Sequence, residues 1–537
     1  MSTAKKIETD YNNMEDYFPF PTMRTGQDYI FHAMKKHLLN PEIRYILIEA
    51  STGLGKSALA LAAAGASKAA YLATANKFLQ DQYSRDFSDI MVELKGRANY
   101  RCNCHEVPEE LKETIGKYYN CGNSPCRNTP ETRGICAKDR SCEYHKQLSR
   151  AARATITSFN FASALAFLNY MQSYFKPRNL LVCDECHNLP DWITNFVSID
   201  ITVRTLKELE LKTIIPEYDS VSEYAMFISD VQHEINYKLN NEELVDSKIV
   251  HKLENFQKKL ELFDTITNTK QDMGNFVMEK TYDHDNKIKI VKIAFKPVVI
   301  ADIIHEYLFD YADKILLLSA TILDFDTYTE IMGIDPKQTA IIKVPSTFPV
   351  ENRPIYTHMS VGYINKNNID AMLPNMVKVI RAILDHYPAY KGIIHGVTYK
   401  ICDYLYEYLN DSRILYPRKA EQQKEYFETH LASAEPTILL SPSMTEGVDL
   451  KHDSSRLQII AKTPYAYLGD PVLKARMEIY ENYYNMLTAL HLTQAYGRSI
   501  RDENDFCFTF ILDKCVLSFV AANKDILQSS FLEAFQE

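Results

Sequence analysis

The sequence has 537 residues, which is enough for three or four domains of about 100–200 residues each. A hydrophobic content of 46% and a charged content of 24% are ordinary for a globular protein with buried cores. The formal net charge of −10 argues against nucleic-acid binding by the chain as a whole, but it does not exclude such binding, which depends on local charge.

Neither end of the chain nor its most apolar tract indicates export or membrane insertion. The N-terminal residues MSTAKKIETDYNNMEDYF carry acids and have no apolar core, which excludes a signal peptide. The longest apolar tract, at 58–73, is interrupted by Lys68 and is too polar to span a membrane. We therefore expect a cytoplasmic protein (in the host cytoplasm, if viral) without a membrane partner, in which disulfides are disfavoured.

Residues 45–64, YILIEASTGLGKSALALAAA, predict a buried strand, a loop with two glycines and a helix. The loop fits the phosphate-binding pattern, with Ala50 at the position of the usual first glycine. Glycines let backbone N–H groups face phosphate oxygens at a helix N-terminus. Lys56 is expected to reach the β- and γ-phosphates and Ser57 to ligate Mg²⁺. The predicted nucleotide-binding residues here are Ser51, Thr52, Gly53, Leu54, Gly55, Lys56 and Ser57.

A second part of the nucleotide site is predicted at 180–190, LLVCDECHNLP. A short apolar run typical of a buried parallel strand delivers two acids at its C-terminal end. Asp184 is expected to hold Mg²⁺, and Glu185 to orient and deprotonate the attacking water. Cys183 and Cys186 form a C-x-x-C pair, but Cys183 belongs to the strand, where free cysteine behaves as a small hydrophobe rather than a redox group.

Six of the eleven cysteines lie between residues 102 and 142. The surrounding segment 95–155 is basic, because its Lys and Arg residues outnumber its acids by five. Four cysteines at irregular spacing suit either tetrahedral Zn²⁺ or an iron–sulfur cluster, and His105 and His145 are further possible zinc ligands. The residues alone leave both metals open.

Near the C-terminus, Arg498 and Arg501 are three residues apart, so on a helix they would share one face. Presented from a second domain, two such guanidinium groups would act as arginine fingers on a γ-phosphate. Hydrolysis would then depend on domain closure, which is how an NTPase becomes a motor.

Several segments resemble the motifs of superfamily 2 helicases, in that family's order. DECH at 184–187 closely resembles the DEAH box, and LLLSATIL at 316–323 resembles motif III. KGIIHGVTYKICDYL at 391–405 looks like the first strand and helix of a second RecA-like domain, while 438–450 and 494–506 resemble motifs V and VI. KGRANYRC at 95–102 and CEYHKQLSRAARATITSFNF at 142–161 resemble the iron–sulfur helicases of the XPD/DinG family.

The resemblance assigns further roles. Arg24 and Gln27, in MRTGQDYI, would contact the nucleotide, although an ordinary polar pair at a helix start is the alternative. The other residues that the resemblance places in the motor are Asp449 in ATP binding, Gln494 in catalysis, Ser319, Thr321 and Glu446 in coupling, Thr74 near the DNA backbone, and Tyr100 and Phe159 as stacking platforms for bases.

The resemblance also implies a [4Fe–4S] cluster held by four thiolates. Cys102 and Cys142 flank the segment, and Cys136 matches the spacing of the third ligand. Cys126 is favoured as the remaining ligand, with Cys121 as the alternative, and Cys104 is expected to be a bystander.

The implied fold class is α/β: two RecA-like doubly wound parallel sheets, with an iron–sulfur domain and a small helical arch inserted in the first. The expected boundaries are 1–95, 151–195 and 293–345 for the first RecA-like domain, 96–150 for the iron–sulfur domain, 196–292 for the arch and 346–537 for the second RecA-like domain.

The implied activity is that of an ATP-dependent, 5′→3′ DNA helicase, with single-stranded and forked duplex DNA as partners, ATP and Mg²⁺ as cofactors and a monomeric motor. The start of the chain close to Arg24 predicts that no exonuclease domain precedes it, and its length suggests a compact bacterial, archaeal or viral relative. Two alternatives are an RNA or RNA–DNA hybrid helicase with the same engine, and a DNA-binding scaffold with a degenerate ATPase and a zinc site.

Overall fold

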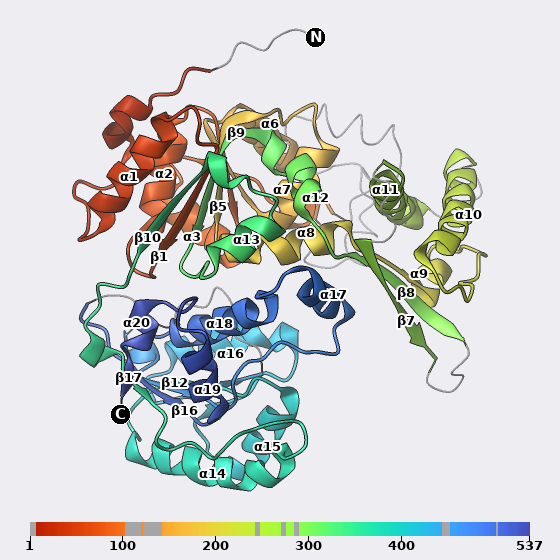
Figure 1. Ribbon diagram of the computed structural model, residues 1–537. Coiled ribbons are helices and arrows are strands. Elements are labelled where there is room, and N and C mark those ends of the chain that lie inside the picture. Colours follow the sequence, from red (N-terminus) through yellow and green to blue (C-terminus); the bar gives the residue numbers. More distant parts are fainter. Residues whose placement is uncertain are drawn as a thin grey trace.

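The computed structural model describes residues 7–102, 120–122, 142–241, 247–269, 275–283, 289–442, 450, 452–500 and 503–536. Figure 1 shows two α/β bodies, one above the other, and a smaller lobe that projects from the side of the upper body. The described chain begins on the upper body and ends on the lower one.

The upper body is built on a seven-stranded parallel sheet with the strand order β10-β1-β9-β5-β2-β4-β3. Its strands are β1 (Tyr45–Ala50), β2 (Ala70–Thr74), β3 (Val92–Glu93), β4 (Ile156–Asn160), β5 (Arg178–Asp184), β9 (Ala312–Ser319) and β10 (Thr339–Val344). Its helices are η1 (Tyr11–Tyr17), α1 (Gln27–Leu39), α2 (Lys56–Ala66), α3 (Lys77–Phe87), η2 (Arg97–Asn99), α6 (Glu143–Arg153), α7 (Phe161–Tyr170), η5 (Cys186–Asn188), α8 (Leu189–Val197), α12 (Ala301–Tyr307), η8 (Phe309–Tyr311), α13 (Phe325–Ile331) and η9 (Pro336–Gln338).

Strand β1 shows why this sheet is buried on both faces. Alternate side chains of a strand point to opposite faces. Ile46 and Ile48 pack into one hydrophobic core, whereas Tyr45 and Leu47 pack into another. The continuous apolar run in the sequence therefore serves two cores at once, as parallel strands between helical layers require.

The lower body repeats this plan with a seven-stranded parallel sheet in the order β13-β14-β12-β15-β16-β11-β17. Its strands are β11 (Ile355–Tyr356), β12 (Gly392–His395), β13 (Ile414–Leu415), β14 (Ile438–Ser441), β15 (Leu457–Ile460), β16 (Phe508–Ile511) and β17 (Phe535–Gln536). Its helices are η10 (Val350–Asn352), α14 (Ile369–His386), α15 (Tyr399–Leu409), α16 (Ala420–Ala432), η11 (His452–Ser454), α17 (Pro471–Ile479), α18 (Tyr483–Tyr496), α19 (Cys515–Ala522) and α20 (Ser529–Leu532). The predicted α/β class with two parallel sheets is confirmed.

The lobe lies between β5 and β9 in the sequence and contains more than the predicted helices. Helices α9 (Val203–Glu208), α10 (Val221–Asn240) and α11 (Ser247–Thr269) pack beside a three-stranded antiparallel sheet. Its strands are β6 (Ile199–Thr202), β7 (Phe276–Tyr282) and β8 (Ile290–Pro297). The arch therefore contains a sheet beside the predicted helices, and its predicted boundary at 292 falls inside β8. Most of β7 is half-buried or exposed, so its apolar alternation is weak.

The two bodies and the lobe meet at Arg476, on α17 of the lower body. Its guanidinium is only 1% exposed and donates to Thr194 Oγ1 on α8 at 2.6 Å. It also donates to the carbonyl of Val298, just after β8, at 2.9 Å, and to Tyr483 Oη at 3.1 Å. One buried cation thus joins α17 to both the upper body and the chain that returns from the lobe.

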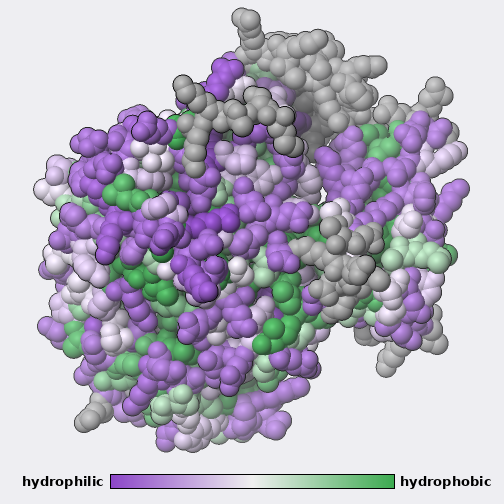
Figure 2. Space-filling model, turned by 45° about the horizontal axis from the view of Figure 1, so that its top comes forward, coloured by the Kyte–Doolittle hydropathy of each residue, from purple (hydrophilic) through white to green (hydrophobic). Residues whose placement is uncertain are grey.

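The face shown in Figure 2 is mainly hydrophilic, with apolar residues in small groups. Across the described part of the chain, every helix is either too short or too polar to cross a bilayer.

His430, on α16, makes the lower body sensitive to acid. Its Nε2 donates to the Ser454 carbonyl at 2.8 Å, and its Nδ1 lies 2.8 Å from the Thr437 hydroxyl, which can donate to the neutral ring. Burial lowers the pKa of His430 to about 4. The stabilisation is therefore complete above the unfolded pKa of about 6.5 and is lost as the pH falls towards 4, at a cost of about 2 kcal/mol by pH 5.

Between pH 7 and pH 5, we expect the free energy of unfolding to fall by about 2 kcal/mol less in His430→Gln than in the wild type. Urea denaturation at both pH values measures this difference. Parallel pH profiles for the two proteins would show that His430 does not carry the effect.

Candidate active site

The phosphate loop follows β1 and ends at the N-terminus of α2, as predicted. Gly53 and Gly55 have φ values of +85° and +72°, in the region that favours glycine. The ammonium of Lys56 donates to the carbonyls of Ala50 at 2.8 Å and Ser51 at 3.3 Å. The loop thus has the backbone shape that surrounds a phosphate, with a cation at its centre.

Arg24 and Gln27 hold this loop from outside. Arg24 donates to the Gly53 carbonyl at 2.7 Å, and the Gln27 amide donates to the Gly55 carbonyl at 3.0 Å. A Cβ at Gly55 would clash with the Gln27 amide, so the Gln27 side chain would have to move away from the loop. The predicted pair is therefore brought to the nucleotide site, where it supports the loop backbone.

Two acids end β5 beside the loop. Burial and the Glu185 carboxylate raise the pKa of Asp184 to about 6, against the opposing attraction of Lys56. Asp184 accepts from the buried Tyr83 hydroxyl at 2.8 Å, and the Ser57 side chain contacts the same phenol. Glu185 has φ +57° and ψ 48°, a left-handed conformation that costs about 1–3 kcal/mol and turns the chain sharply after the strand.

His187 connects this acid pair to the other body. Its Nδ1 lies 2.7 Å from Ser319 Oγ, at the end of β9, and 3.4 Å from Glu185 Oε2. Gln494, on α18 of the lower body, donates its amide to His187 Nε2 at 2.5 Å. These partners assign the proton to Nδ1, and burial lowers the pKa of His187 to about 4, so the ring is neutral near pH 7.

The two bodies meet at further points around this chain of contacts. Thr52 Oγ1, in the phosphate loop, lies 3.5 Å from the Ile500 carbonyl. Gln528 donates its amide to the Ala320 carbonyl, next to Ser319, at 2.7 Å. The nucleotide loop and the segment after β9 therefore both face the lower body.

Arg498 lies in a turn rather than on a helix. Helix α18 ends at Tyr496 and Gly497 follows it, so the predicted helical face shared by Arg498 and Arg501 is wrong. The Arg498 charge helps to lower the pKa of both His187 and His395, which places it within electrostatic reach of both bodies. Arg501, Glu446 and Asp449 lie outside the described residues.

Two buried hydroxyl oxygens at the site have no hydrogen-bond partner among the described residues: Ser51 Oγ in the phosphate loop and Thr321 Oγ1 after β9. Buried polar groups are almost always paired. The orphaned Ser51 hydroxyl, the two glycine turns and the Lys56 ammonium fit a bound phosphate group. Ser57 and Asp184 supply the oxygen ligands that Mg²⁺ prefers.

Phe159 and Thr74, predicted to be near DNA, are both 0% exposed. The Phe159 ring packs against Tyr71 and Phe175, with centroids 5.8 and 5.6 Å away. Its role as a stacking platform is therefore wrong, because β4 is an inner strand with both faces covered. The Thr74 hydroxyl donates to the carbonyls of Asn76 and Phe159 at 3.1 and 3.3 Å, and its side chain is not accessible from the surface of the described structure.

The described cysteines of the basic segment gather at one edge of the upper body. Arg101 and Asn120 form an isolated antiparallel bridge, which sets Cys121 opposite Tyr100, whose carbonyl accepts from the Cys121 N–H at 2.9 Å. Cys121 and Cys142 are buried in the same hydrophobic core, and Cys102 packs against it. Tyr100, half-buried, packs edge-on against Tyr144 at 5.6 Å. Cys126 and Cys136 lie outside the described residues, within which no group of three metal-ligating side chains occurs.

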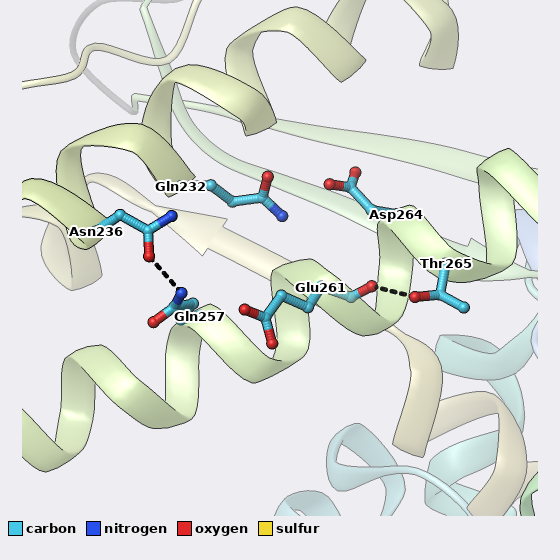
Figure 3. A pocket seen from close by; sticks show the side chains of 6 residues that line it. All are labelled: Gln232, Asn236, Gln257, Glu261, Asp264 and Thr265. Carbon is cyan, nitrogen blue, oxygen red and sulfur yellow. Dashed lines mark hydrogen bonds between the residues drawn. The ribbon is translucent and has the colours of Figure 1, made fainter.

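A polar pocket of about 280 Å³ lies between α10 and α11 of the lobe, far from these residues in the sequence (Figure 3). Gln257 donates to Asn236 across it at 2.5 Å, and Thr265 donates to the Glu261 carbonyl of its own helix at 2.8 Å. None of the residues that line this pocket belongs to the predicted nucleotide site.

Three residues of the site were not predicted from the sequence. His187 is the last letter of DECH, so the motif itself was the available signal. Tyr83 lies on an amphipathic helix and donates to Asp184, and Glu49 lies in an apolar strand and accepts from the Ile322 N–H. Both partners are distant in the sequence, so no local pattern identifies these residues.

Comparisons with known proteins agree with this arrangement. Residues 391–534 match the family described as Helicase C-terminal domain. The chain is 22% identical to the ATP-dependent DNA helicase YoaA of Escherichia coli, over 86% of each protein. It is 20% identical to the ATP-dependent DNA helicase CHL1 of Candida albicans, over 63% of this chain and 53% of that relative.

Solved structures show the same fold. One named XPD helicase superimposes with a TM-score of 0.65 at 15% identity, over 94% of this chain and 99% of that one. Xpd4 of S. tokodaii superimposes with a TM-score of 0.59 at 13% identity, over 96% and 99%. The resemblance predicted from the motifs is therefore confirmed: over most of its length, the chain is similar to the XPD/DinG-like helicases of superfamily 2.

Proposed function

We propose that the chain is an ATP-dependent DNA helicase that translocates 5′→3′ on single-stranded DNA and unwinds duplex. The observation that carries the proposal is the chain of contacts from Gln494 through His187 to Ser319. It joins the nucleotide acids to the second body, as a motor driven by closure of two domains requires. The sequence relatives named as ATP-dependent DNA helicases support the same activity.

In this mechanism ATP binds at the phosphate loop, with Lys56 on the β- and γ-phosphates. Ser57 and Asp184 would hold Mg²⁺, which neutralises phosphate charge when bound. Asp184 serves as a ligand in its ionised form, so its raised pKa makes the site weaker in acid and stronger above about pH 6.

Glu185 orients the attacking water and takes its proton. Arg498 and Arg501 approach from the second body and stabilise charge on the γ-phosphate as arginine fingers. Because burial lowers the pKa of His187 to about 4, the ring is neutral near pH 7, and its hydrogen bonds to Gln494 and Ser319 connect the acid pair to the second body without adding charge.

Single-stranded and forked duplex DNA are the proposed substrates, and a monomer is the proposed working unit. The excess of Lys and Arg in 95–155 supplies cations for DNA phosphates in an otherwise acidic chain. The half-buried Tyr100 is the remaining candidate for base stacking. Polarity follows from the family resemblance alone.

Four thiolates are proposed to hold a [4Fe–4S] cluster, which braces the basic segment when bound. The described cysteines form no disulfide with one another, and their thiol chemistry suits iron–sulfur ligation. Cys102, Cys136 and Cys142 are the proposed ligands. Cys126 is the proposed fourth ligand, with Cys121 as the alternative.

The activity is tested with ATP hydrolysis in the presence and absence of DNA, and with unwinding of matched DNA, hybrid and RNA duplexes that carry a 5′ or a 3′ tail. We expect DNA-stimulated hydrolysis and unwinding of 5′-tailed DNA. Stronger unwinding of RNA would favour an RNA helicase, 3′-tail preference would reverse the polarity, and hydrolysis that DNA does not stimulate would favour a scaffold.

The cluster is tested by anaerobic purification, visible spectroscopy and iron and zinc counting. We expect Cys136→Ser to lower unwinding by about tenfold or more while DNA-stimulated hydrolysis persists, because loss of a ligand disorders the basic segment and not the nucleotide site. Comparing the iron content of Cys121→Ser and Cys126→Ser identifies the fourth ligand. A colourless, zinc-loaded wild type would contradict the cluster, and normal unwinding by Cys136→Ser would remove that residue from the ligand set.

A further inference from the structure

A buried acid stands in β1, directly before the phosphate loop. Glu49 is 1% exposed, in a strand whose other residues are almost all apolar. The carbonyl of the next residue, Ala50, accepts a hydrogen bond from the Lys56 ammonium. Burying a carboxylate is costly unless it is paired and hydrogen-bonded, so its partners indicate why it is there.

Glu49 Oε2 accepts two backbone N–H groups, from Ile322 at 2.7 Å and from Leu323 at 2.6 Å. Hydrogen bonds to an ionised acceptor are about twice as strong as neutral ones. Leu323 has φ +66°, a left-handed conformation that is strained for a residue with a side chain. The carboxylate therefore holds the backbone in a shape that it would not adopt by itself.

The other oxygen, Oε1, faces a cation. Lys343, the register partner of Glu49 on β10, lies 3.7 Å from it. The Lys343 side chain is 46% exposed, so this pair contributes little compared with the two short backbone hydrogen bonds. The main task of Glu49 is to hold the chain after β9.

The held segment, residues 319–323, is in contact with both bodies. Ser319 meets His187 of the DECH segment, and the Ala320 carbonyl accepts from Gln528 of the lower body. The Thr321 N–H donates to Ser319 Oγ at 3.0 Å, which makes the segment a tight turn. Glu49 fixes the end of this turn to the strand that carries the phosphate loop.

We propose that Glu49 is a positioning residue that couples the phosphate loop to residues 319–323. A shift of the loop on nucleotide binding or release moves the end of β1, and the carboxylate passes that movement to the segment that Gln528 and His187 contact. The inference rests on the proposed helicase function, because it concerns how hydrolysis and DNA binding are linked.

The test compares ATP hydrolysis of the full chain with and without single-stranded DNA, at varied ATP concentration, in three variants. Glu49→Ala removes both acceptors, Glu49→Gln keeps one oxygen for the two N–H groups, and Lys343→Met removes only the ion pair. We expect Glu49→Ala to lower the DNA stimulation ratio by about tenfold while the KM for ATP changes by less than about twofold. Glu49→Gln is expected to restore most of the ratio, and Lys343→Met to change it by less than about twofold.

Hydrogen exchange of the peptide that covers 319–324 gives a second readout that does not depend on hydrolysis. We expect the amides of Ile322 and Leu323 to exchange at least about tenfold faster in Glu49→Ala and nearly as in the wild type in Glu49→Gln. If the alanine variant does not fold, Glu49→Asp, which keeps the charge but is one methylene shorter, takes its place with the same expectations.

A wild-type stimulation ratio in Glu49→Ala, with the two amides exposed, would overturn the inference. A raised KM with an unchanged ratio would also overturn it, because Glu49 would then support only nucleotide binding. A wild-type chain that DNA does not stimulate would contradict the proposed function itself, and is thereby distinguished from a failure that is confined to the variants.

Discussion

Replacement of Lys56 by alanine is expected to lower ATP hydrolysis by about 10²–10³-fold. The Lys56 ammonium is the cation at the centre of the phosphate loop, where its hydrogen bonds to the Ala50 and Ser51 carbonyls aim it into the loop. Its loss removes a preorganised charge from the place where negative charge develops. Steady-state hydrolysis with saturating DNA measures the effect, and thermal unfolding checks that the fold persists.

Lys36→Ala provides a matched control, because Lys36 is an exposed lysine on α1 of the same body. It removes one positive charge without touching the loop and is expected to hydrolyse ATP at close to the wild-type rate. Hydrolysis retained by Lys56→Ala would show that nucleotide is bound and turned over elsewhere in the chain.

Arg498→Ala is expected to lower the rate of hydrolysis by about 10³-fold or more, the range of a lost arginine finger. Arg498 comes from the second body and lies within electrostatic reach of His187 and His395. Its contribution is made mainly in the transition state, so the affinity for ATP should fall by only a few-fold. Single-turnover hydrolysis and binding of a fluorescent ATP analogue measure the two quantities separately.

Arg498→Lys sharpens this experiment, since lysine keeps the charge but lacks the planar fork of donors. A finger role predicts that lysine restores only a small part of the rate. An equal loss of ATP binding and hydrolysis in Arg498→Ala would instead place the residue in ground-state binding.

The sequence predicts the architecture well where an element is decided by residues that are close together in the chain. A buried strand, a glycine-containing loop and a helix follow one another within 45–64, and strand and helix at 391–405 are likewise found at 392–395 and 399–409. The antiparallel sheet of the lobe was missed because most of β7 is half-buried or exposed and β8 has three consecutive buried residues, so neither strand shows a clear alternation.

The two halves of the nucleotide site were predictable because each is a short motif at a strand end. The contacts that connect the two halves to the rest of the fold were not predictable. His187 meets Gln494 across 307 positions, and Glu49 meets Ile322 across 273. Such contacts are decided by sheet order, which brings β1 and β9 side by side, and no local pattern records it.

The errors have the same origin. Phe159 is an aromatic residue in a segment that resembles a DNA-binding motif, yet β4 pairs with both β2 and β3 and carries the ring into the core. The spacing of Arg498 and Arg501 suits a helix, but α18 stops at Tyr496 with Gly497 as its cap. Residue type and spacing alone cannot reveal where a strand lies in its sheet or where a helix ends.

Arg476 makes the interface between the two bodies stronger at one end than at the other. Stripping the partners from a buried charge costs about 3–5 kcal/mol, so the end of the interface at α17 resists separation. At the phosphate loop, the contact between Thr52 and Ile500 is a single long hydrogen bond of 3.5 Å. The bodies should therefore separate more easily at the phosphate loop than at α17, once Gln494 and Gln528 have released His187 and Ala320. Because Arg476 also donates to the Val298 carbonyl, each separation of the two bodies would displace the chain at the point where it returns from the lobe.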